Sequence, residues 1–174
     1  MNDTGVIGRK DEYHVLEKCY HSKDAQLVIV YGRRRVGKTY LINQAFESDF
    51  AFKITGAYGQ AKNTQLMNFT MELSRKEGKE HPLFKDWPSA FNALIDYLDS
   101  LPKDKKQVVF IDEMPWFDTF KSGFLPAFEY FWNNYGSAKN NLLLIVAGSI
   151  SSWISEKLLI IKAGYLTGTR LDYI

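Results

Sequence analysis

The residues of this chain with the clearest chemical meaning lie in one short loop. Gly32, Gly37, Lys38 and Thr39 occupy the fixed positions of the pattern G-x-x-x-x-G-K-[ST]. Glycines permit backbone angles that let successive N–H groups converge on phosphate oxygens, and a following helix adds the partial positive charge of its N-terminus. Lys38 is placed to neutralise β- and γ-phosphate oxygens, and the Thr39 hydroxyl is placed to ligate Mg²⁺. The pattern predicts a loop that binds the phosphates of a nucleotide.

The remaining positions of this loop and the residue after it are variable in the pattern. They are Arg33, Arg34, Arg35, Val36 and Tyr40. We expect the whole stretch from residue 32 to residue 40 to surround the nucleotide. The three arginines have two interpretations: a basic patch for nucleic acid or a catalytic arginine, and exposed charges that only add positive potential beside a polyphosphate.

An acidic pair follows a second apolar segment. Asp112 and Glu113 come directly after the apolar residues 108–111, at the carboxyl end of a predicted strand, where open α/β sheets place their ligands. Asp112 is positioned to hold the Mg²⁺ shell through water, and Glu113 to orient and polarise a water that attacks the γ-phosphate. The other interpretation is that the pair merely begins a solvated turn. A phosphate loop earlier in the chain favours the metal site.

A hydroxyl lies at the end of a third apolar segment. Ser149 follows Gly148 directly after the apolar run 142–147. At the carboxyl end of a strand, this hydroxyl can bind the γ-phosphate or the attacking water, and thereby take part in catalysis as a sensor of the bound state. Ser149 can also be the N-cap of a following helix, and the two roles are compatible.

Apolar runs of strand length alternate with helical patterns along the chain. The patterns predict strands at 26–31, 50–55, 107–111 and 142–147. They predict helices at 9–20, 38–46, 63–76, 88–101, 124–135 and 149–159. This alternation is typical of an α/β fold, a three-layer αβα sandwich in which helices cover both faces of a mostly parallel sheet.

Length and composition favour one ordinary domain. The chain has 174 residues, of which 45% are hydrophobic and 24% charged, as in average globular domains. A formal net charge of +2 argues against a dedicated duplex-binding module. The single cysteine, Cys19, cannot close an intramolecular disulfide. The sequence shows neither a signal peptide nor an apolar run long enough for a membrane span, so we expect a cytoplasmic protein without membrane association.

With these motifs placed, the chain resembles the archaeal and bacterial P-loop ATPases at the border of the AAA+ and STAND groups, which are related to the origin-recognition ATPases. The resemblance covers essentially the whole chain. It is carried by the segments Ile7–Glu12, which is similar to the family's G-R-x-x-E box, Tyr31–Thr39, Phe110–Trp116 and Ala147–Ser149. The resemblance implies ATP as the nucleotide, with Mg²⁺. It also implies that Ile7, Gly8 and Arg9 border the adenine.

The same resemblance carries expectations about architecture. It implies a five-stranded sheet in which the Asp-Glu strand is inserted between neighbours of the phosphate-loop strand. Family members continue into a helical lid and a winged-helix domain, whereas this chain ends at Ile174, so we expect both to be absent and the core to be truncated at its C-terminus. Residues 1–174 would then form a single ATPase core. Its parts are an adenine-side segment with a lead-in helix, 1–22, and the nucleotide-binding αβα core, 23–174.

Three further residues have two interpretations each. Trp116 and Phe117 look like part of a family loop that contacts a partner, and taken alone they are core or rim aromatics. Arg170 is either an arginine finger that reaches a neighbouring subunit or an ordinary surface arginine.

The sequence therefore favours an ATP-binding protein that hydrolyses ATP with Mg²⁺, slowly in this short form, to switch a protein partner. A nucleotide-binding scaffold or truncated remnant without hydrolysis is the first alternative. A nucleic-acid-binding module that uses the arginine run is the second, and the near-neutral charge weighs against it. A small-molecule kinase is the third, and the carboxylate of Glu113 argues against it. The N-K-x-D pattern of GTPases is missing from the sequence, which favours ATP over GTP.

Overall fold

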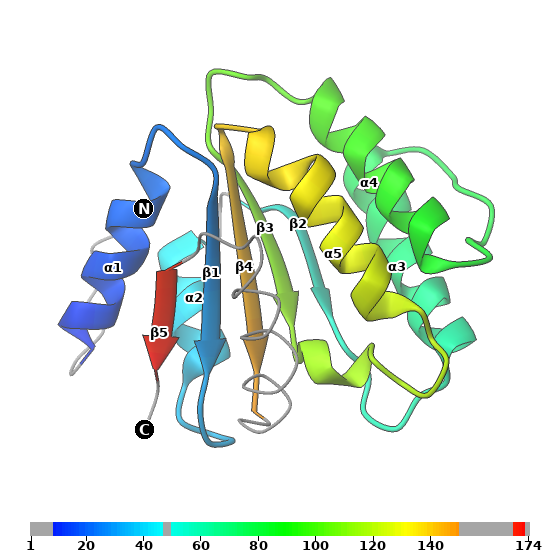
Figure 1. The fold of residues 1–174 in the computed structure, drawn as a ribbon, viewed down its shortest axis with the longest axis horizontal. Coiled ribbons are helices and arrows are strands. Elements are labelled where there is room, and N and C mark those ends of the chain that lie inside the picture. Colours follow the sequence, from blue (N-terminus) through cyan, green and yellow to red (C-terminus); the bar gives the residue numbers. More distant parts are fainter. Residues whose placement is uncertain (1–8, 47–49, 150–168, 173–174) are drawn as a thin grey trace.

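Five parallel strands form one sheet in the order β2-β3-β4-β1-β5 (Figure 1). The computed structural model describes residues 9–46, 50–149 and the backbone of 169–172. The strands are β1 (Gln26–Tyr31), β2 (Phe50–Thr55), β3 (Gln107–Asp112), β4 (Leu142–Gly148) and the short β5 (Thr169–Asp172). The α/β fold class predicted from the sequence is therefore confirmed.

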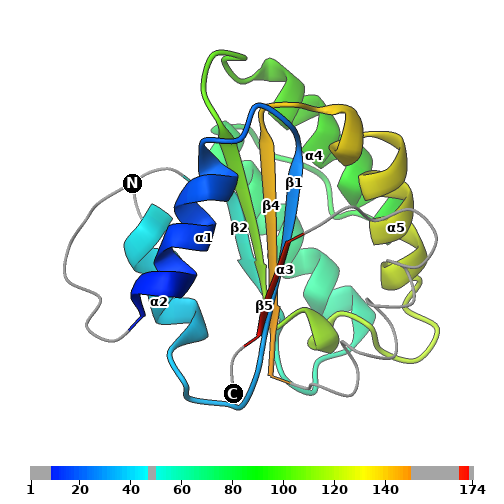
Figure 2. The ribbon, with the colours of Figure 1, turned by 60° about the vertical axis from the view of Figure 1, so that its left-hand side comes forward.

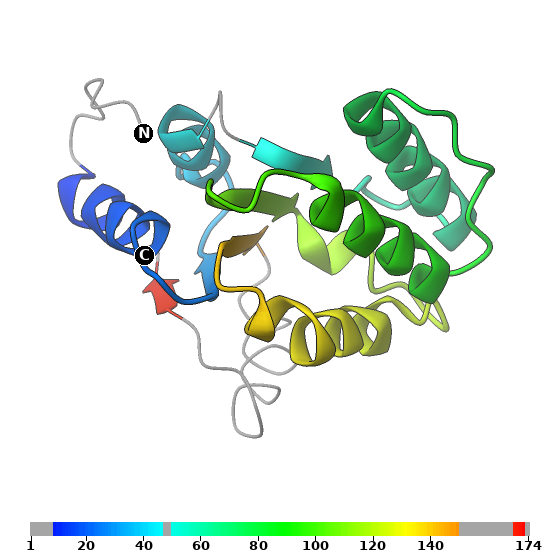
Figure 3. The same ribbon diagram turned by 90° about the horizontal axis from the view of Figure 1, so that it is seen from above.

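Helices cover both faces of the sheet and make the three layers of the sandwich. They are α1 (Lys10–Tyr20), α2 (Lys38–Phe46), α3 (Lys62–Glu77), α4 (Trp87–Ser100) and α5 (Phe124–Asn134), with short 3₁₀ helices η1 (Met114–Trp116) and η2 (Gly136–Ala138). Figures 2 and 3 show α1 and α2 on one side of the sheet and α4 and α5 on the other. Apolar side chains of α3 belong to the same buried cluster as those of α4 and α5.

The central strands are buried on both faces, as parallel strands between two helical layers must be. In β1, Leu27 and Ile29 pack toward α3, α4 and α5, whereas Val28 and Val30 pack toward α1 and α2. All residues of β4 are buried, in keeping with its place at the centre of the sheet. The alternating faces of these strands explain why the apolar runs of the sequence are continuous.

Aromatic side chains dominate the larger of the two cores. Phe117, just after η1, stacks on Phe124 with ring centroids 5.0 Å apart and meets Trp87 edge-on at 5.4 Å. Such offset-stacked and edge-to-face pairs are the favourable arrangements of aromatic rings. The turn that follows β3 is therefore anchored in the packed interior.

Most predicted elements lie where the sequence places them. The predicted bounds of β1, β2 and α2 are those of the structure, and the other described strands and helices differ by one or two residues. The expected insertion of the Asp-Glu strand between neighbours of the phosphate-loop strand is wrong. The neighbours of β1 are β4 and β5, and β3 lies one place further out, between β4 and β2. The helix expected at 149–159 extends outside the described residues, and β5 was not located from the sequence pattern.

Candidate functional site

The expected site residues gather at one edge of the sheet, where β1, β3 and β4 end. The three arrowheads point the same way in Figure 1 because the strands are parallel. The phosphate loop leaves the end of β1, Asp112 is the last residue of β3, and Ser149 follows the end of β4. Ligands of open α/β sheets bind at this edge.

The phosphate loop has the backbone conformation of a tight anion-binding turn. Arg35 and Gly37 both have positive φ angles, of 65° and 87°. For a non-glycine residue such as Arg35, this left-handed conformation costs about 1 kcal/mol or more. α2 begins directly after the turn, and the Leu41 N–H donates to the carbonyl oxygen of Gly37 over 2.9 Å. The loop and the helix N-terminus are thus arranged as the motif requires for phosphate.

The ammonium group of Lys38 is folded into the loop. Lys38 Nζ donates to the carbonyl oxygens of Arg33 over 2.8 Å and Gly32 over 3.2 Å, and the residue is only 6% exposed. Burial lowers the pKa of Lys38, and the nearby carboxylates of Glu113 and Asp112 act in the opposite direction. The cation is therefore held at the phosphate loop with two acidic groups close to it.

Asp112 and Thr39 form the contact between the acidic pair and the phosphate loop. The Thr39 hydroxyl donates to Asp112 Oδ2 over 2.8 Å, and the Glu113 N–H donates to Asp112 Oδ1 over 2.9 Å. Asp112 is 4% exposed, and burial raises its pKa despite these two hydrogen bonds. A buried carboxylate of this kind is stabilised by a cation.

This donor set fits Mg²⁺. A hydroxyl and a carboxylate are hard oxygen ligands, and Mg²⁺ in nucleotide sites takes one or two protein oxygens together with phosphates and water. Within the described residues, no group of three or more His, Cys, Asp or Glu side chains could hold a metal without such additional ligands. Thr39 and Asp112 are therefore the residues that would hold the ion.

Glu113 and Ser149 also meet. The Ser149 hydroxyl donates to Glu113 Oε2 over 3.0 Å, and Arg34 Nε donates to Ser149 Oγ over 3.4 Å. Glu113 itself has a left-handed backbone, with φ 48° and ψ 42°. Gly56, which follows β2, packs so closely that an added Cβ would lie 2.5 Å from the Glu113 carbonyl oxygen. The conformation of Glu113 therefore depends on a glycine at position 56.

The N-terminal segment reaches the phosphate loop through one arginine. Arg9 Nη2 donates to the Val36 carbonyl oxygen over 2.6 Å, and Arg9 Nη1 forms an ion pair with Glu12 at 3.3 Å. Ile7 and Gly8 lie outside the described residues. Tyr40 is on the exposed side of α2, and the backbone of Arg170 is part of β5.

The structure adds residues that the motifs do not include. Gln65 of α3 is fully buried; its side-chain amide donates to the carbonyl oxygens of Ala57 over 2.7 Å and Trp116 over 3.0 Å, and it accepts from the Ala57 N–H. It joins the loop after β2 to η1. A polar residue among the core-facing positions of a predicted helix was the signal that could have identified it.

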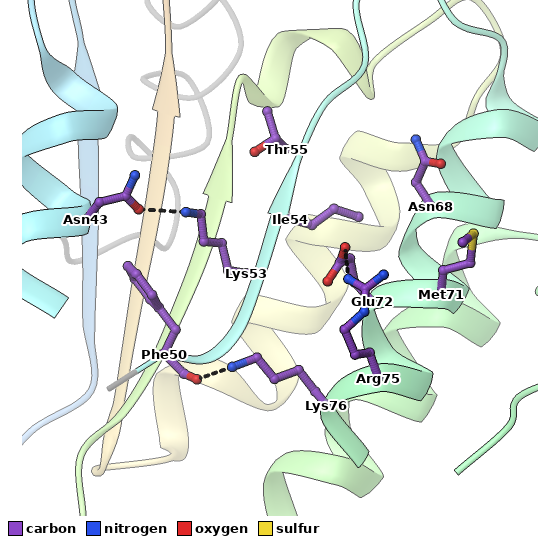
Figure 4. A pocket seen from close by; sticks show the side chains of 10 residues that line it. All are labelled: Asn43, Phe50, Lys53, Ile54, Thr55, Asn68, Met71, Glu72, Arg75 and Lys76. Atoms are coloured by element: carbon purple, nitrogen blue, oxygen red, sulfur yellow. Dashed lines mark hydrogen bonds and ion pairs between the residues drawn. The ribbon is translucent and has the colours of Figure 1, made fainter. Parts of the chain in front are cut away.

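A groove of about 630 Å³ lies between α2, β2 and α3 (Figure 4). Lys53 points from β2 across this groove and donates to Asn43 Oδ1 over 2.6 Å. Asn43 lies one helical turn after Thr39, and Thr55 at the upper end of the groove pairs in register with Asp112. The groove therefore adjoins the Thr39–Asp112 pair, and the charge of Lys53 contributes to lowering the pKa of Asp112 against the larger effect of burial.

The chain belongs to a family described as an ATPase domain found predominantly in Archaea, whose model matches residues 7–171. Two curated relatives come from Methanocaldococcus jannaschii. The uncharacterized protein MJECL04 is 27% identical over 157 residues, which are 90% of this chain and 32% of that protein. The uncharacterized ATP-binding protein MJ0423 is 48% identical over 42 residues, which are 24% of this chain and 71% of that protein.

Solved structures share the fold at low sequence identity. The Walker-type ATPase PABY2304 of Pyrococcus abyssi has a TM-score of 0.63 and 19% identity, over 92% of this chain and 51% of that one. The Aeropyrum pernix ORC2 protein, solved in ADPNP and ADP complexes, has a TM-score of 0.65 and 16% identity, over 97% of this chain and 48% of that one. The expected membership of an archaeal P-loop ATPase family is thus confirmed by the family model, and these two structures show that the fold is shared.

This chain spans about half the length of those two structures and a third of the longer curated relative. Among the residues that the structure describes, no helix has the length and apolar character needed to cross a bilayer.

Proposed function

We propose that this chain binds ATP with Mg²⁺ and hydrolyses it, and that the nucleotide state switches a protein partner. Membership of an ATPase-domain family and the ATP-binding name of one relative support the nucleotide. The observation that carries the proposal is the 2.8 Å hydrogen bond between Thr39 and Asp112, which brings the phosphate loop and the acidic pair into one site. A phosphate loop alone would bind nucleotide, and the acidic pair beside it provides the means of hydrolysis.

The reaction is in-line attack of water on the γ-phosphorus. The water oxygen forms the new bond, the bond from the γ-phosphorus to the β,γ-bridging oxygen breaks, and ADP leaves with that oxygen. Glu113 orients the water and accepts its proton, while Ser149, which donates to Glu113, contacts the same water. Lys38 exchanges its contacts with the loop carbonyls for β- and γ-phosphate oxygens and offsets their developing charge.

Thr39 and Asp112 would hold Mg²⁺, which supplies charge neutralisation at the β- and γ-phosphates when it is bound. The backbone of residues 32–40 would surround the phosphates. We place the adenine beside the N-terminal segment, and the Arg9–Val36 contact supports this placement, since it brings the start of α1 to the phosphate loop.

Residues 1–174 act in this proposal as a single ATPase core. Because the Pyrococcus and Aeropyrum proteins are about twice as long as the matched region, a further domain or a separate protein would receive the switch. ATP and ADP differ by the γ-phosphate, and the groups placed to detect it are Lys38 and Ser149.

The test is phosphate release from ATP with Mg²⁺ by the wild type, Lys38→Ala and Glu113→Gln. We expect Lys38→Ala to lose both ATP binding and release, and Glu113→Gln to keep binding but lose release by about a hundredfold or more. Lys76→Met, which removes a lysine outside the site, serves as the control. Equal rates in all variants would contradict hydrolysis at this site, and tight binding without wild-type release would support the non-hydrolysing alternative.

A further inference from the structure

We propose that Arg34 is a positioning residue for Glu113, acting through the Ser149 hydroxyl while Tyr58 and Trp116 hold its guanidinium group. This role rests on the proposed hydrolysis of ATP. It gives one of the three loop arginines a specific task and assigns a function to Trp116. Arg34 is brought to Glu113 by contacts among four segments that are remote in the sequence: the phosphate loop, the loop after β2, the turn that carries Glu113 and η1, and the end of β4.

An aromatic platform receives the guanidinium group. The Tyr58 and Trp116 rings form an edge-to-face pair with centroids 4.5 Å apart. Arg34 Cζ lies 5.5 Å from the Trp116 ring centroid and 5.7 Å from that of Tyr58. A guanidinium at these distances is attracted to the negative faces of aromatic rings. Although Arg34 is on an exposed loop, it is directed to the site by two rings.

Hydrogen-bond chemistry then fixes the orientation of the Ser149 hydroxyl. An arginine can only donate hydrogen bonds, and a serine hydroxyl has a single proton. In the contact with Arg34, Ser149 Oγ must therefore accept, so its proton is left for Glu113 Oε2, 3.0 Å away. Arg34 thereby favours the hydroxyl orientation that holds the carboxylate in place. Charge-assisted bonds of this kind are stronger and more directional than neutral ones.

The backbone that carries the platform is bonded to a buried side chain and does not depend on the phosphate loop. The buried side-chain amide of Gln65 forms hydrogen bonds with the backbone of Ala57, which directly precedes Tyr58, and with the backbone of Trp116. All three hydrogen bonds come from one side chain of α3 that is inaccessible to solvent. The backbone on which Tyr58 and Trp116 stand is consequently held before a ligand arrives, as preorganised positioning requires.

A direct role at the phosphates would give a different result from this positioning role. If Arg34 bound phosphate, its loss would weaken ATP binding. If Arg34 acts on Glu113 through Ser149, its loss lowers kcat and leaves KM nearly unchanged, and a second loss at Ser149 adds little. Residues that act as one unit show this non-additivity.

The experiment is a double-mutant cycle on ATP hydrolysis. We expect Arg34→Met and Ser149→Ala each to lower kcat about tenfold, with KM within about twofold of wild type, and the double variant to lose about tenfold as well. Arg34→Lys keeps the charge but loses the planar fork and the stacking geometry, so we expect little rescue. Arg75→Met, which removes an exposed arginine paired with Glu72, should match wild type.

A nucleotide-free readout accompanies the kinetics. The Arg34 Nε–H signal in a nitrogen-15 NMR spectrum, identified by its loss in Arg34→Lys, should move in Trp116→Leu because the ring current of Trp116 is removed. Three results would each overturn the role of Arg34 without affecting the proposed hydrolysis. They are a loss of about a hundredfold in the kcat of the double variant, wild-type kcat in Arg34→Lys, and an Arg34 signal that does not move in Trp116→Leu. A wild type that releases no phosphate would instead overturn the proposed function, and this role with it.

Discussion

The hydroxyl of Thr39 donates to Oδ2 of Asp112 over 2.8 Å, although the two residues are separated by 73 positions in the sequence. Thr39 lies in the first turn of α2 and Asp112 ends β3, so the bond extends across the end of β4, which separates β1 from β3. The phosphate loop and the acidic pair therefore meet through side chains while their strands are not adjacent.

We expect Asp112→Asn to raise the free energy of unfolding by about 1 kcal/mol at pH 7 while abolishing the Mg²⁺-dependent part of ATP binding. Burial raises the pKa of Asp112, so the folded protein binds this proton more tightly than the unfolded chain. Stability therefore falls as pH rises through the raised pKa, and the variant avoids this loss. Urea unfolding without nucleotide measures the gain.

The stability gained in Asp112→Asn depends on pH, because it reflects the ionisation of the buried carboxyl. The difference between Asp112→Asn and wild type should shrink as pH falls toward the ordinary aspartate value of 3.8. An asparagine variant that is less stable than wild type at pH 7 would show that the carboxylate is not penalised by burial.

We expect Lys53→Met to move the loss of Mg²⁺-dependent ATP binding to higher pH. Burial is the main cause that raises the pKa of Asp112, and the positive charge of Lys53 opposes it, so removing this charge raises that pKa further. Since the ionised carboxylate is the ligand, Mg²⁺ affinity at mildly acidic pH should fall by roughly threefold.

Titration of ATP binding with Mg²⁺ at several pH values measures this shift. Lys76→Met is the matched control, because Lys76 lines the same groove but donates to the carbonyl oxygen of Phe50 over 2.9 Å (Figure 4). An equal shift in both variants would contradict a specific effect of Lys53.

Gly56→Ala should destabilise the protein by about 1–3 kcal/mol and lower ATP hydrolysis. The added Cβ would lie 2.5 Å from the carbonyl oxygen of Glu113 and 3.1 Å from Cβ of Trp116, so the turn that carries Glu113 must move. Thermal unfolding and phosphate release measure the two effects. Gly59→Asn is the control, since nothing lies within 4 Å of that position and asparagine tolerates its φ of +66°. Wild-type hydrolysis in Gly56→Ala would argue against a fixed Glu113 backbone.

Replacing the buried amide in Gln65→Leu should cost about 1–3 kcal/mol of stability, because three backbone groups of Ala57 and Trp116 lose their partner. Trp116 should become more accessible to solvent, which an acrylamide quenching measurement detects. Gln60→Leu replaces an exposed glutamine of the neighbouring segment and should leave stability within about 0.5 kcal/mol of wild type. Equal quenching in both variants would contradict the bridging role of Gln65.

The sequence predicted those strands and helices whose apolar residues follow a pattern that burial imposes. β1 and β4 are continuous apolar runs that end near glycines, and such runs are recognisable because both faces are buried. β5 was missed because Thr169–Asp172 has only 4 residues and its strand conformation depends on pairing with β1. Pairing at a sheet edge is a tertiary property that a short, mixed segment does not encode locally.

Only part of the candidate site could be predicted from the sequence. Motif spacing named Lys38, Thr39, Asp112, Glu113 and Ser149, because the chemistry of phosphate and metal restricts residue types there. The position of Arg34 could not be predicted, since it depends on rings from two other loops and on a hydroxyl at the end of β4. The structure brings these residues together, and the assigned roles of the site residues remain predictions.

The packing of Phe117 against Trp87 and Phe124 has a genetic consequence. Glu113 shares a short turn with Phe117, so alterations of the aromatic interior can displace a carboxylate that they never touch. In a random mutagenesis screen for lost ATP hydrolysis, we expect to find core substitutions such as Trp87→Leu, which lower activity as substitutions in the site do. Suppressors of these substitutions should map to neighbouring large hydrophobic positions instead of to the phosphate loop.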